Sequence, residues 1–197
     1  MLIQYLIKQS RKPSGLVGRL ITNIWSSYFK ELSLWAIKQT TIPNNSRILE
    51  IGYGGGSTFK NLLALDKDLD IHGIDISEES YHTARRIHSE AIENGSVKLR
   101  IGNVANLPYQ NSDFDLVFAI QTHIFWDDLK QSFQEIYRVM SNPSTLIIAS
   151  EKEKIKYHMT DYGTSHELRQ LLTSIGFSKI EEKQNYKWVV YVVTKSD

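Results

Sequence analysis

A glycine-rich segment, Glu50 to Ser57, carries the residues whose types and spacing most favour chemistry; it reads EIGYGGGS. Glycine lets the backbone turn sharply and approach a ligand closely, and a helix beginning after such a loop presents free N–H groups and positive potential. By itself the loop is compatible with a dinucleotide pyrophosphate. The dinucleotide fingerprint, however, expects a third glycine where Ser57 stands. The carboxylate of Glu50 also suits a cationic ligand better than a pyrophosphate.

A second acidic residue, Asp75, ends the next apolar run, 19 residues beyond Gly56. A carboxylate at the end of such a strand can accept hydrogen bonds from both hydroxyls of a ribose. Ligands of open α/β sheets lie beyond the carboxyl ends of the strands, so Asp75 and the glycine loop are expected to meet there. Together they predict a site for a ribose-containing ligand.

The segment QTHIFWD, which begins at Gln121, offers further candidates. His123 titrates in a range that suits proton removal near neutrality. The alternative is that His123 is a polar residue at a helix start that holds a backbone group. Phe125 and Trp126 fit either a flat or apolar ligand or the core. Asp127 is predicted to be the N-cap of the next helix.

Strands and helices alternate along the body of the chain. Apolar runs predict strands at 47–51, 71–76, 97–101, 114–120 and 145–149, and helical patterns occupy 57–65, 77–93, 127–140 and 166–175. Two closing strands, 179–186 and 188–194, must be antiparallel, because their connection is too short for a crossover. The chain is therefore predicted to be α/β. The expected fold is Rossmann-like and doubly wound: a mostly parallel seven-stranded sheet with an antiparallel C-terminal strand pair and an N-terminal helical arm.

Composition excludes several classes of protein. The chain has 197 residues, the length of one ordinary domain, and no cysteine, which excludes a disulfide scaffold, a cysteine zinc site and a thiol nucleophile. No metal-binding motif is evident, so no metal is expected. No stretch approaches 18 apolar residues and no secretory signal is recognisable, so we expect a cytoplasmic protein. The formal net charge of +1 gives no basic field for nucleic acid.

Charge is nevertheless uneven along the chain. Residues 1–47 contain seven basic residues against Glu31 alone, a net charge of +6, which leaves −5 for the remainder. We expect a helical arm over residues 1–42, followed by a domain over 43–197. The arm is a candidate for weak contact with an anionic ligand or membrane surface. The alternative is a solvated helical face.

These motifs resemble the class I S-adenosylmethionine-dependent methyltransferases, and most closely the small-molecule, methyltransferase type 11-like group. The segments ILEIGYGGGST and HGIDIS match the first two motifs of that family. GNVANLPYQNSDFDLVFA, and the helix ending in YRVM before STLIIAS, match the third and fourth. The resemblance implies transfer of a methyl group from S-adenosylmethionine to a small-molecule acceptor by in-line displacement, with S-adenosylhomocysteine as the product and His123 as a candidate base.

The resemblance also implies roles for individual residues. Glu50 and the glycine loop would hold the methionine part of the cofactor, and Asp75 the ribose. Gln121 would lie near the cofactor's amino group and the transferred methyl. The adenine would contact the residues after the second and third strands. The implied cofactor-binding set is Glu50, Gly52, Tyr53, Gly54, Gly56, Asp75, Ile76, Asn103, Val104 and Gln121.

Two positions depart from the family pattern. Asn103 stands where Asp is common, and its carbonyl can still accept a hydrogen bond from the adenine amino group. Tyr53 is bulky where a small residue is usual, and it either walls the methyl pocket or packs on the loop. The arm is expected to close over the acceptor as a lid. The alternative functions are a non-catalytic S-adenosylmethionine-binding protein and an NAD-dependent oxidoreductase; the sequence predicts no oligomeric state.

Overall fold

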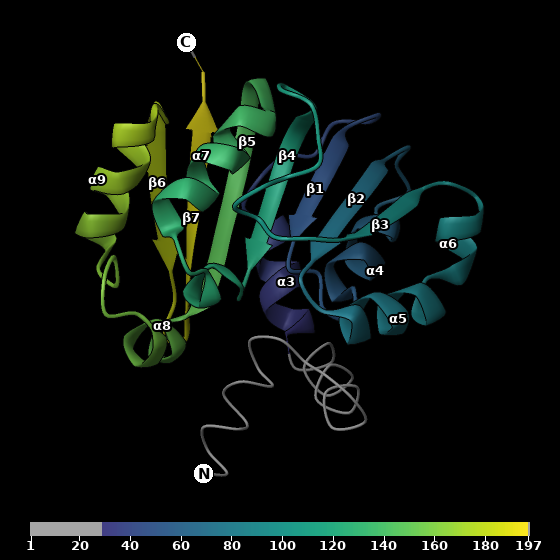
Figure 1. The fold of residues 1–197 in the computed structure, drawn as a ribbon, viewed down its shortest axis with the longest axis horizontal. Coiled ribbons are helices and arrows are strands. Elements are labelled where there is room, and N and C mark those ends of the chain that lie inside the picture. Colours follow the sequence, from purple (N-terminus) through teal and green to yellow (C-terminus); the bar gives the residue numbers. More distant parts are fainter. Residues whose placement is uncertain (1–28, 197) are drawn as a thin grey trace.

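The computed structural model describes residues 29–196. Its centre is a seven-stranded sheet in the order β3-β2-β1-β4-β5-β7-β6 (Figure 1). The order reverses between β1 and β4, the point at which open α/β sheets place their ligands. The strands are β1 (Arg47–Ile51), β2 (Asp70–Asp75), β3 (Val97–Ile101), β4 (Phe114–Ile120), β5 (Met140–Glu151), β6 (Lys179–Gln184) and β7 (Trp188–Lys195).

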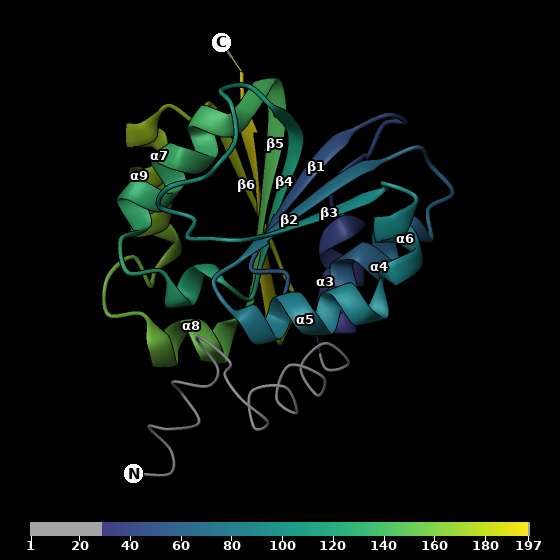
Figure 2. The ribbon, with the colours of Figure 1, turned by 45° about the vertical axis from the view of Figure 1, so that its right-hand side comes forward.

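Helices cover both faces of the sheet. In Figure 2, α7 and α9 lie on one side of the strands, and α3, α4, α5 and α6 lie on the other. Strands β1 to β5 pair in parallel, whereas β7 runs antiparallel to both β5 and β6. This confirms the predicted mostly parallel sheet with an antiparallel C-terminal pair. The helices are α3 (Lys30–Ile37), α4 (Ser57–Leu63), α5 (Glu78–Ile87), α6 (Ser89–Glu93), α7 (Leu129–Val139), α8 (Lys152–His158) and α9 (Ser165–Ile175), with a 3₁₀ turn, η1 (His123–Phe125).

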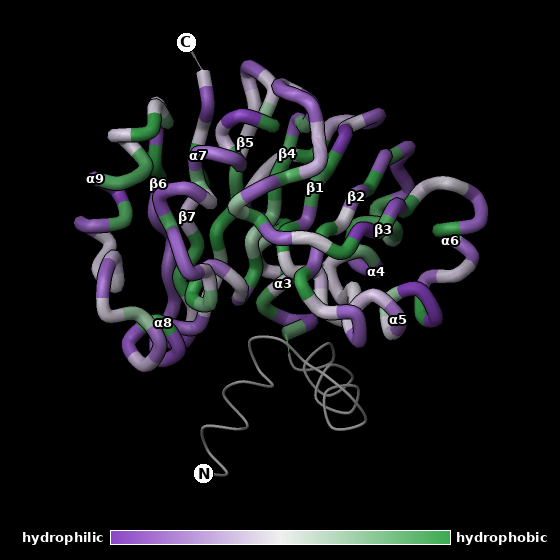
Figure 3. The backbone as a smooth tube through the Cα atoms, viewed as in Figure 1, coloured by the Kyte–Doolittle hydropathy of each residue, from purple (hydrophilic) through white to green (hydrophobic). Residues whose placement is uncertain are grey.

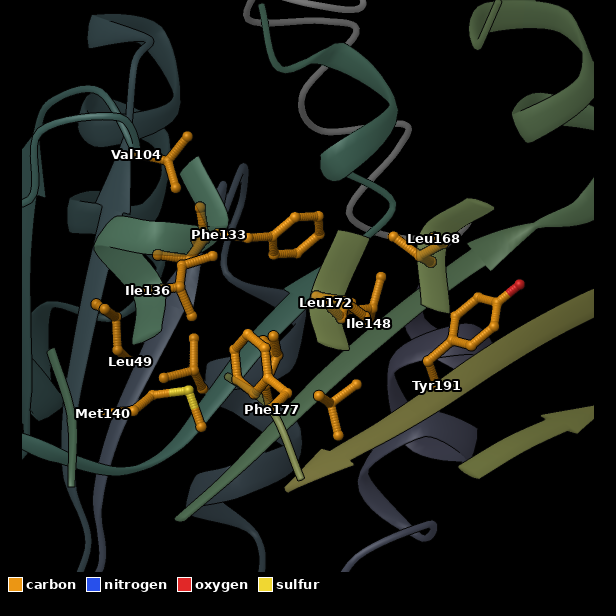
Figure 4. Packing of buried hydrophobic residues seen from close by; sticks show 14 of the residues in the cluster. Leu49, Val104, Phe133, Ile136, Met140, Ile148, Leu168, Leu172, Phe177 and Tyr191 are labelled. Atoms are coloured by element: carbon orange, nitrogen blue, oxygen red, sulfur yellow. The ribbon is translucent and has the colours of Figure 1, made fainter. Parts of the chain in front are cut away.

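Two hydrophobic clusters sandwich the sheet. Alternate residues of one strand point to opposite faces, so Leu49 of β1 enters the cluster under α7 and α9, while its neighbour Ile48 enters the other. Phe133 and Leu172 bring α7 and α9 onto the first cluster, as Figure 4 shows. The apolar segments accordingly concentrate in the central strands of Figure 3. The sheet is therefore a rigid base for the loops at its strand ends.

Several boundaries differ from those predicted. The helix predicted over 77–93 is two helices, α5 and α6, which meet at His88. Helix α8 was not predicted, because its sequence is mostly charged and only Ile155 is buried, so it has no apolar stripe to detect. Strand β5 is longer than the predicted apolar run at both ends.

The predicted arm is described only from residue 29 onward. Its helix α3 is part of the domain: Leu32 and Ala36 are fully buried, and Ser33 donates a hydrogen bond to Thr58 of α4 at 3.1 Å. One side of α3 thus packs into the core of the domain. The predicted helix and lid within residues 1–28 lie outside the described residues.

Candidate functional site

A cavity of about 380 Å³ opens at the carboxyl ends of β1, β2 and β4, where the strand order reverses. That volume falls within the range of ~300–1,000 Å³ usual for small-molecule sites. Its lining combines the glycine loop, the ends of β2 and β3, the segment after β4 and one residue before α3. The lining residues include Phe29, Glu50, Gly52, Tyr53, Gly54, Ser57, Thr58, Asp75, Ile76, Ser80, Asn103, Val104, Gln121, Thr122, Phe125, Trp126 and Asp127.

The glycine loop requires glycine for conformational and steric reasons. Gly52 has φ +73°, and a Cβ there would overlap the side chain of Thr122. The Gly52 N–H donates to the Ile74 carbonyl at 2.7 Å, which joins the loop to β2. Gly56 is the left-handed N-cap of α4, with φ +77° and His88 directly behind it. The loop is therefore held closely against its supports and turns into α4 beside the cavity.

Glu50 is the least solvated acid of the cavity, with 3% of its surface exposed. Burial raises its pKa from 4.5 to about 8, the Thr58 hydroxyl lowers it, and the negative charge of Asp75 raises it further. Its Oε2 atom has no hydrogen-bond partner. A buried carboxyl oxygen without a partner is costly unless a ligand completes it. Glu50 therefore fits the α-ammonium group of a bound amino acid moiety.

Asp75 ends β2 and ties two backbone segments together. Its Oδ2 accepts the Gly54 N–H at 2.8 Å, and its Oδ1 accepts the Ser77 N–H at 2.9 Å. Burial raises the pKa of Asp75, and these backbone hydrogen bonds oppose that shift. Each carboxylate oxygen retains further acceptor capacity, which fits a pair of ribose hydroxyls.

The residues predicted to contact adenine lie together beside Asp75. Ile76 lines the cavity with 40% of its surface exposed, and Val104 lines it from the segment after β3. The Asn103 side-chain oxygen accepts the Ala105 N–H at 2.9 Å, so part of its acceptor capacity already stabilises the turn. An amide oxygen has two lone pairs, and the second remains for a ligand.

Gln121 holds the ends of β4 and β5 together. Its backbone N–H donates to the Ala149 carbonyl at 2.7 Å, and its side-chain oxygen accepts the Glu151 N–H at 2.9 Å. Its φ of +56° is unusual for a residue other than glycine. These contacts hold Gln121 at the cavity wall, just before the aromatic residues Phe125 and Trp126.

Tyr53 packs against its neighbours and also contributes to the cavity lining. It is 3% exposed, its ring packs on Phe59 with centroids 5.5 Å apart, and its hydroxyl donates to the Arg100 carbonyl of β3 at 3.3 Å. The ring is thus directed beneath β2 and β3, although it contributes to the cavity lining. It therefore packs on Phe59 and borders the cavity at the same time.

His123 is buried in the core and not in the cavity lining. It is 1% exposed, it is absent from the cavity lining, and its Nδ1 lies 3.3 Å from the Ser150 hydroxyl. Burial lowers its pKa to about 4. His123 is thus a buried ring that links η1 to the end of β5, and its partner is a side-chain hydroxyl instead of the backbone group that the alternative expected.

Three cavity residues were missed or given another role. Asp128, not Asp127, is the N-cap of α7, with its carboxylate accepting the Gln131 N–H at 2.8 Å. Asp127 instead lies at the cavity mouth. Thr122 faces Gly52, and Phe29 reaches the cavity from the start of α3. Phe29 is not among the predicted site residues, because its approach to the cavity depends on the packing of α3.

Residues 29–196 contain neither a group of metal ligands nor a helix that could span a membrane. Within that range no three His, Asp or Glu side chains are grouped closely enough to hold a metal ion. No described helix is long and apolar enough to cross a membrane.

Comparison with known proteins agrees with this site. A family model described as a methyltransferase domain matches residues 49–148, just over half of the chain. The uncharacterized methyltransferase YdaC of Bacillus subtilis is 31% identical over 109 residues, 55% of this chain and 58% of YdaC. The O-methyltransferase resE of Aspergillus sclerotiorum is 26% identical over 147 residues, 68% of this chain and 55% of resE. The chain thus spans little more than half of the length of these curated relatives.

A solved structure shows the same fold. Phosphoethanolamine N-methyltransferase 2 of Haemonchus contortus, in complex with S-adenosyl-L-methionine, superposes with a TM-score of 0.71 and 16% identity. The match covers 85% of this chain and 53% of that one. The fold and site define a Rossmann-like methyltransferase domain. The chain belongs to the class I S-adenosylmethionine-dependent methyltransferases.

Proposed function

We propose that this protein transfers a methyl group from S-adenosylmethionine to a small-molecule acceptor. The observation that supports this most directly is the buried Glu50 carboxyl, with its unpartnered oxygen, in one cavity with Asp75 and the glycine loop. S-adenosylmethionine has an ammonium group for the first acid and ribose hydroxyls for the second. Both acids fit this ligand.

The cofactor-binding roles follow from the positions of the side chains. Glu50 binds the ammonium group, and the loop backbone at Gly52 and Gly54 lies against the methionine part. Asp75 binds the ribose from the end of β2. Ile76 and Val104 enclose the adenine, and Asn103 meets its edge. Gln121 stands where the donor portion meets the rest of the cavity.

Methyl transfer from a sulfonium requires mainly that the protein position the acceptor. S-adenosylmethionine supplies a methyl group on a sulfonium; in-line attack by an acceptor lone pair forms the new bond to that carbon, the C–S bond breaks, and S-adenosylhomocysteine leaves. Holding the acceptor in line is therefore the main task of the chain. Trp126 is suited to it, because its indole N–H donates to the Thr122 hydroxyl at 3.4 Å and its ring packs on Phe133. We assign no base to His123, which is buried outside the cavity.

A small acceptor is favoured by the shape and lining of the site. The cavity is bounded by described side chains, and its acidic lining gives a nucleic acid no electrostatic attraction. Some relatives are named as O-methyltransferases. A further relative, 30% identical over 108 residues, is named ajmaline N-methyltransferase, from Rauvolfia serpentina. These names support small molecules as the acceptor class without selecting the attacking atom.

Calorimetric titration tests the cofactor directly. S-adenosylmethionine and S-adenosylhomocysteine should bind with micromolar affinity, and NAD should not bind. Asp75→Ala should weaken binding at least 100-fold, because it removes the ribose acceptor and releases Gly54. The matched control, Asp68→Ala, removes an exposed carboxylate outside the cavity and should bind like the wild type. Binding of NAD instead, or equal affinity in both variants, would refute the proposal.

A further inference from the structure

Behind the glycine loop lies a buried histidine, His88, which is not among the residues that line the cavity. It stands where α5 ends and α6 begins, and both helices lie near α4 (Figures 1 and 2). Its backbone N–H donates to the Ala84 carbonyl at 2.9 Å, and its carbonyl accepts the Ile92 N–H at 3.0 Å. The junction is therefore held from both helices, and the His88 residue is 7% exposed.

The ring of His88 packs against the backbone of the glycine loop. A Cβ added at Gly56 would lie 2.6 Å from Nε2 of His88, so glycine at this position leaves room for the ring. The ring also meets Phe59 edge-on, with centroids 5.7 Å apart, and Phe59 in turn packs on Tyr53. Tyr53 and Gly55 line the cavity. His88 thus supports, from outside the cavity, a loop that forms part of the cavity wall.

The Nε2 atom of His88 is buried and has no hydrogen-bond partner among the described residues. In a neutral ring with its proton on Nδ1, Nε2 is an acceptor, and leaving it unpaired has a moderate cost. In the protonated ring Nε2 is a charged N–H donor, and burying a charge without a partner costs much more. The site therefore fits the neutral ring, and a protonated ring has to move toward water. Because the ring contacts Gly56, that movement displaces the loop.

The charges around His88 agree with a neutral ring. Burial lowers the pKa of His88 below its usual 6.5, the backbone of Gly55 and Gly56 partly opposes that shift, and the charge of Lys60 on α4 adds to it. Other charged groups are the cavity acids on the far side of the loop and the exposed residues that flank His88 on its own helices: Glu50, Asp75, Arg85, Arg86 and Glu90. Solvent screens the exposed ones.

From this arrangement we infer that His88 is a positioning residue of the methyl-donor site: its neutral ring holds the backbone of Gly55 and Gly56 in the conformation that binds S-adenosylmethionine, and protonation of the ring loosens that backbone. His88 lies outside the cavity lining, so it acts through the loop. A bound cofactor holds the loop in place and makes protonation of the ring harder still. By linkage, acid then weakens cofactor binding. This inference rests on the proposed function and specifies how pH regulates the same site.

Calorimetric titration with S-adenosylhomocysteine at pH 7.5 and pH 5 tests it on the wild type, His88→Gln and His82→Gln. Glutamine places an amide near the position of Nε2 and takes up no proton, so His88→Gln should bind within threefold of the wild type at pH 7.5. Between pH 7.5 and pH 5 the wild type should lose at least threefold more affinity than His88→Gln. His82→Gln is the matched control, because His82 is exposed on the same helix, and it should follow the wild type. Protonation of Glu50 affects all three proteins alike and cancels in the comparison.

NMR titration of the wild type alone gives a second, independent reading. The His88 ring resonance, assigned through its backbone, should titrate below pH 6.5 in the unliganded protein. With S-adenosylhomocysteine bound, the midpoint should fall by more than 0.5 pH unit, because a threefold loss of affinity requires at least that difference. A ring that only fills space in the core would keep the same midpoint.

The outcomes separate the inference from the proposed function. Equal pH dependence in the wild type and His88→Gln, or a midpoint that S-adenosylhomocysteine leaves unchanged, would overturn the role of His88 and leave the methyl-donor site intact. Failure of the wild type to bind S-adenosylhomocysteine at pH 7.5 would overturn the proposed function, and this inference with it.

Discussion

Replacing Glu50 with glutamine should stabilise the protein at alkaline pH while weakening its cofactor site. In the unliganded protein burial raises the pKa of Glu50 from 4.5 to about 8. The folded state therefore keeps a proton that the unfolded chain loses above pH 4.5. Stability linked to this group is fully present below pH 4.5, and it is lost as the pH rises toward 8. Glutamine resembles the protonated carboxyl and has nothing to titrate.

The magnitude follows from that interval. At 1.36 kcal/mol per pH unit, the span from 4.5 to about 8 corresponds to roughly 5 kcal/mol of unfolding free energy. The amide group of the introduced glutamine has an unpaired N–H, which costs about 1–3 kcal/mol of this gain. The net gain in unfolding free energy of the variant at pH 8 is therefore about 2–4 kcal/mol. Between pH 5 and pH 8 the variant should gain about 4 kcal/mol relative to the wild type.

Urea denaturation of the unliganded protein at pH 5, 6.5 and 8 measures this difference. Thermal melts provide a second reading, at about 2–4 °C for each kcal/mol in a chain of this size. The control is Glu93→Gln, which removes an exposed carboxylate at the end of α6. Parallel pH profiles for wild type and Glu50→Gln would refute the argument, since they would mean that Glu50 ionises normally in the folded protein. S-adenosylhomocysteine should bind the variant at least tenfold more weakly at pH 8.

Three further changes test the supports of the site. Gly52→Ala should lower the unfolding free energy by about 2–3 kcal/mol, more than Gly95→Ala does. Both glycines have positive φ, but only a Cβ at position 52 would also overlap Thr122. Urea denaturation of the two variants measures the difference, and equal losses would contradict the argument. His123→Ala should lower the unfolding free energy by about 2–4 kcal/mol, because it leaves a cavity in the core and removes the partner of Ser150. Its affinity for S-adenosylhomocysteine, measured by calorimetry, should stay within threefold of the wild type. Deletion of residues 1–28 should preserve folding by circular dichroism and S-adenosylhomocysteine affinity within a few-fold, because α3 remains, but should abolish methyl transfer to an acceptor; unchanged turnover would end the lid proposal.

Much of the fold was predictable because its signals are local. Strands such as β4 are nearly continuous apolar runs, and the short connection between β6 and β7 allows only antiparallel pairing. The elements that were misjudged lack such signals. Helix α8 buries one apolar side chain, and the break at His88 occurs within an otherwise continuous helical pattern. The choice between Asp127 and Asp128 as N-cap depends on where the 3₁₀ turn ends, which composition does not reveal.

The sequence by itself determined the part of the cavity that we propose binds the methyl donor. Glu50, the glycines and Asp75 occupy strand ends, and the pairing of parallel strands brings such ends to one edge whatever the details of packing. Only the tertiary structure decided the acceptor half. Neighbouring residues at the turn η1 diverge: His123 enters the core, while Phe125 and the preceding residue Thr122 face the cavity. Phe29 reaches the same cavity because α3 packs on α4 and β5. Side-chain direction in a short turn and the docking of a distant helix depend on three-dimensional packing, which no local pattern encodes.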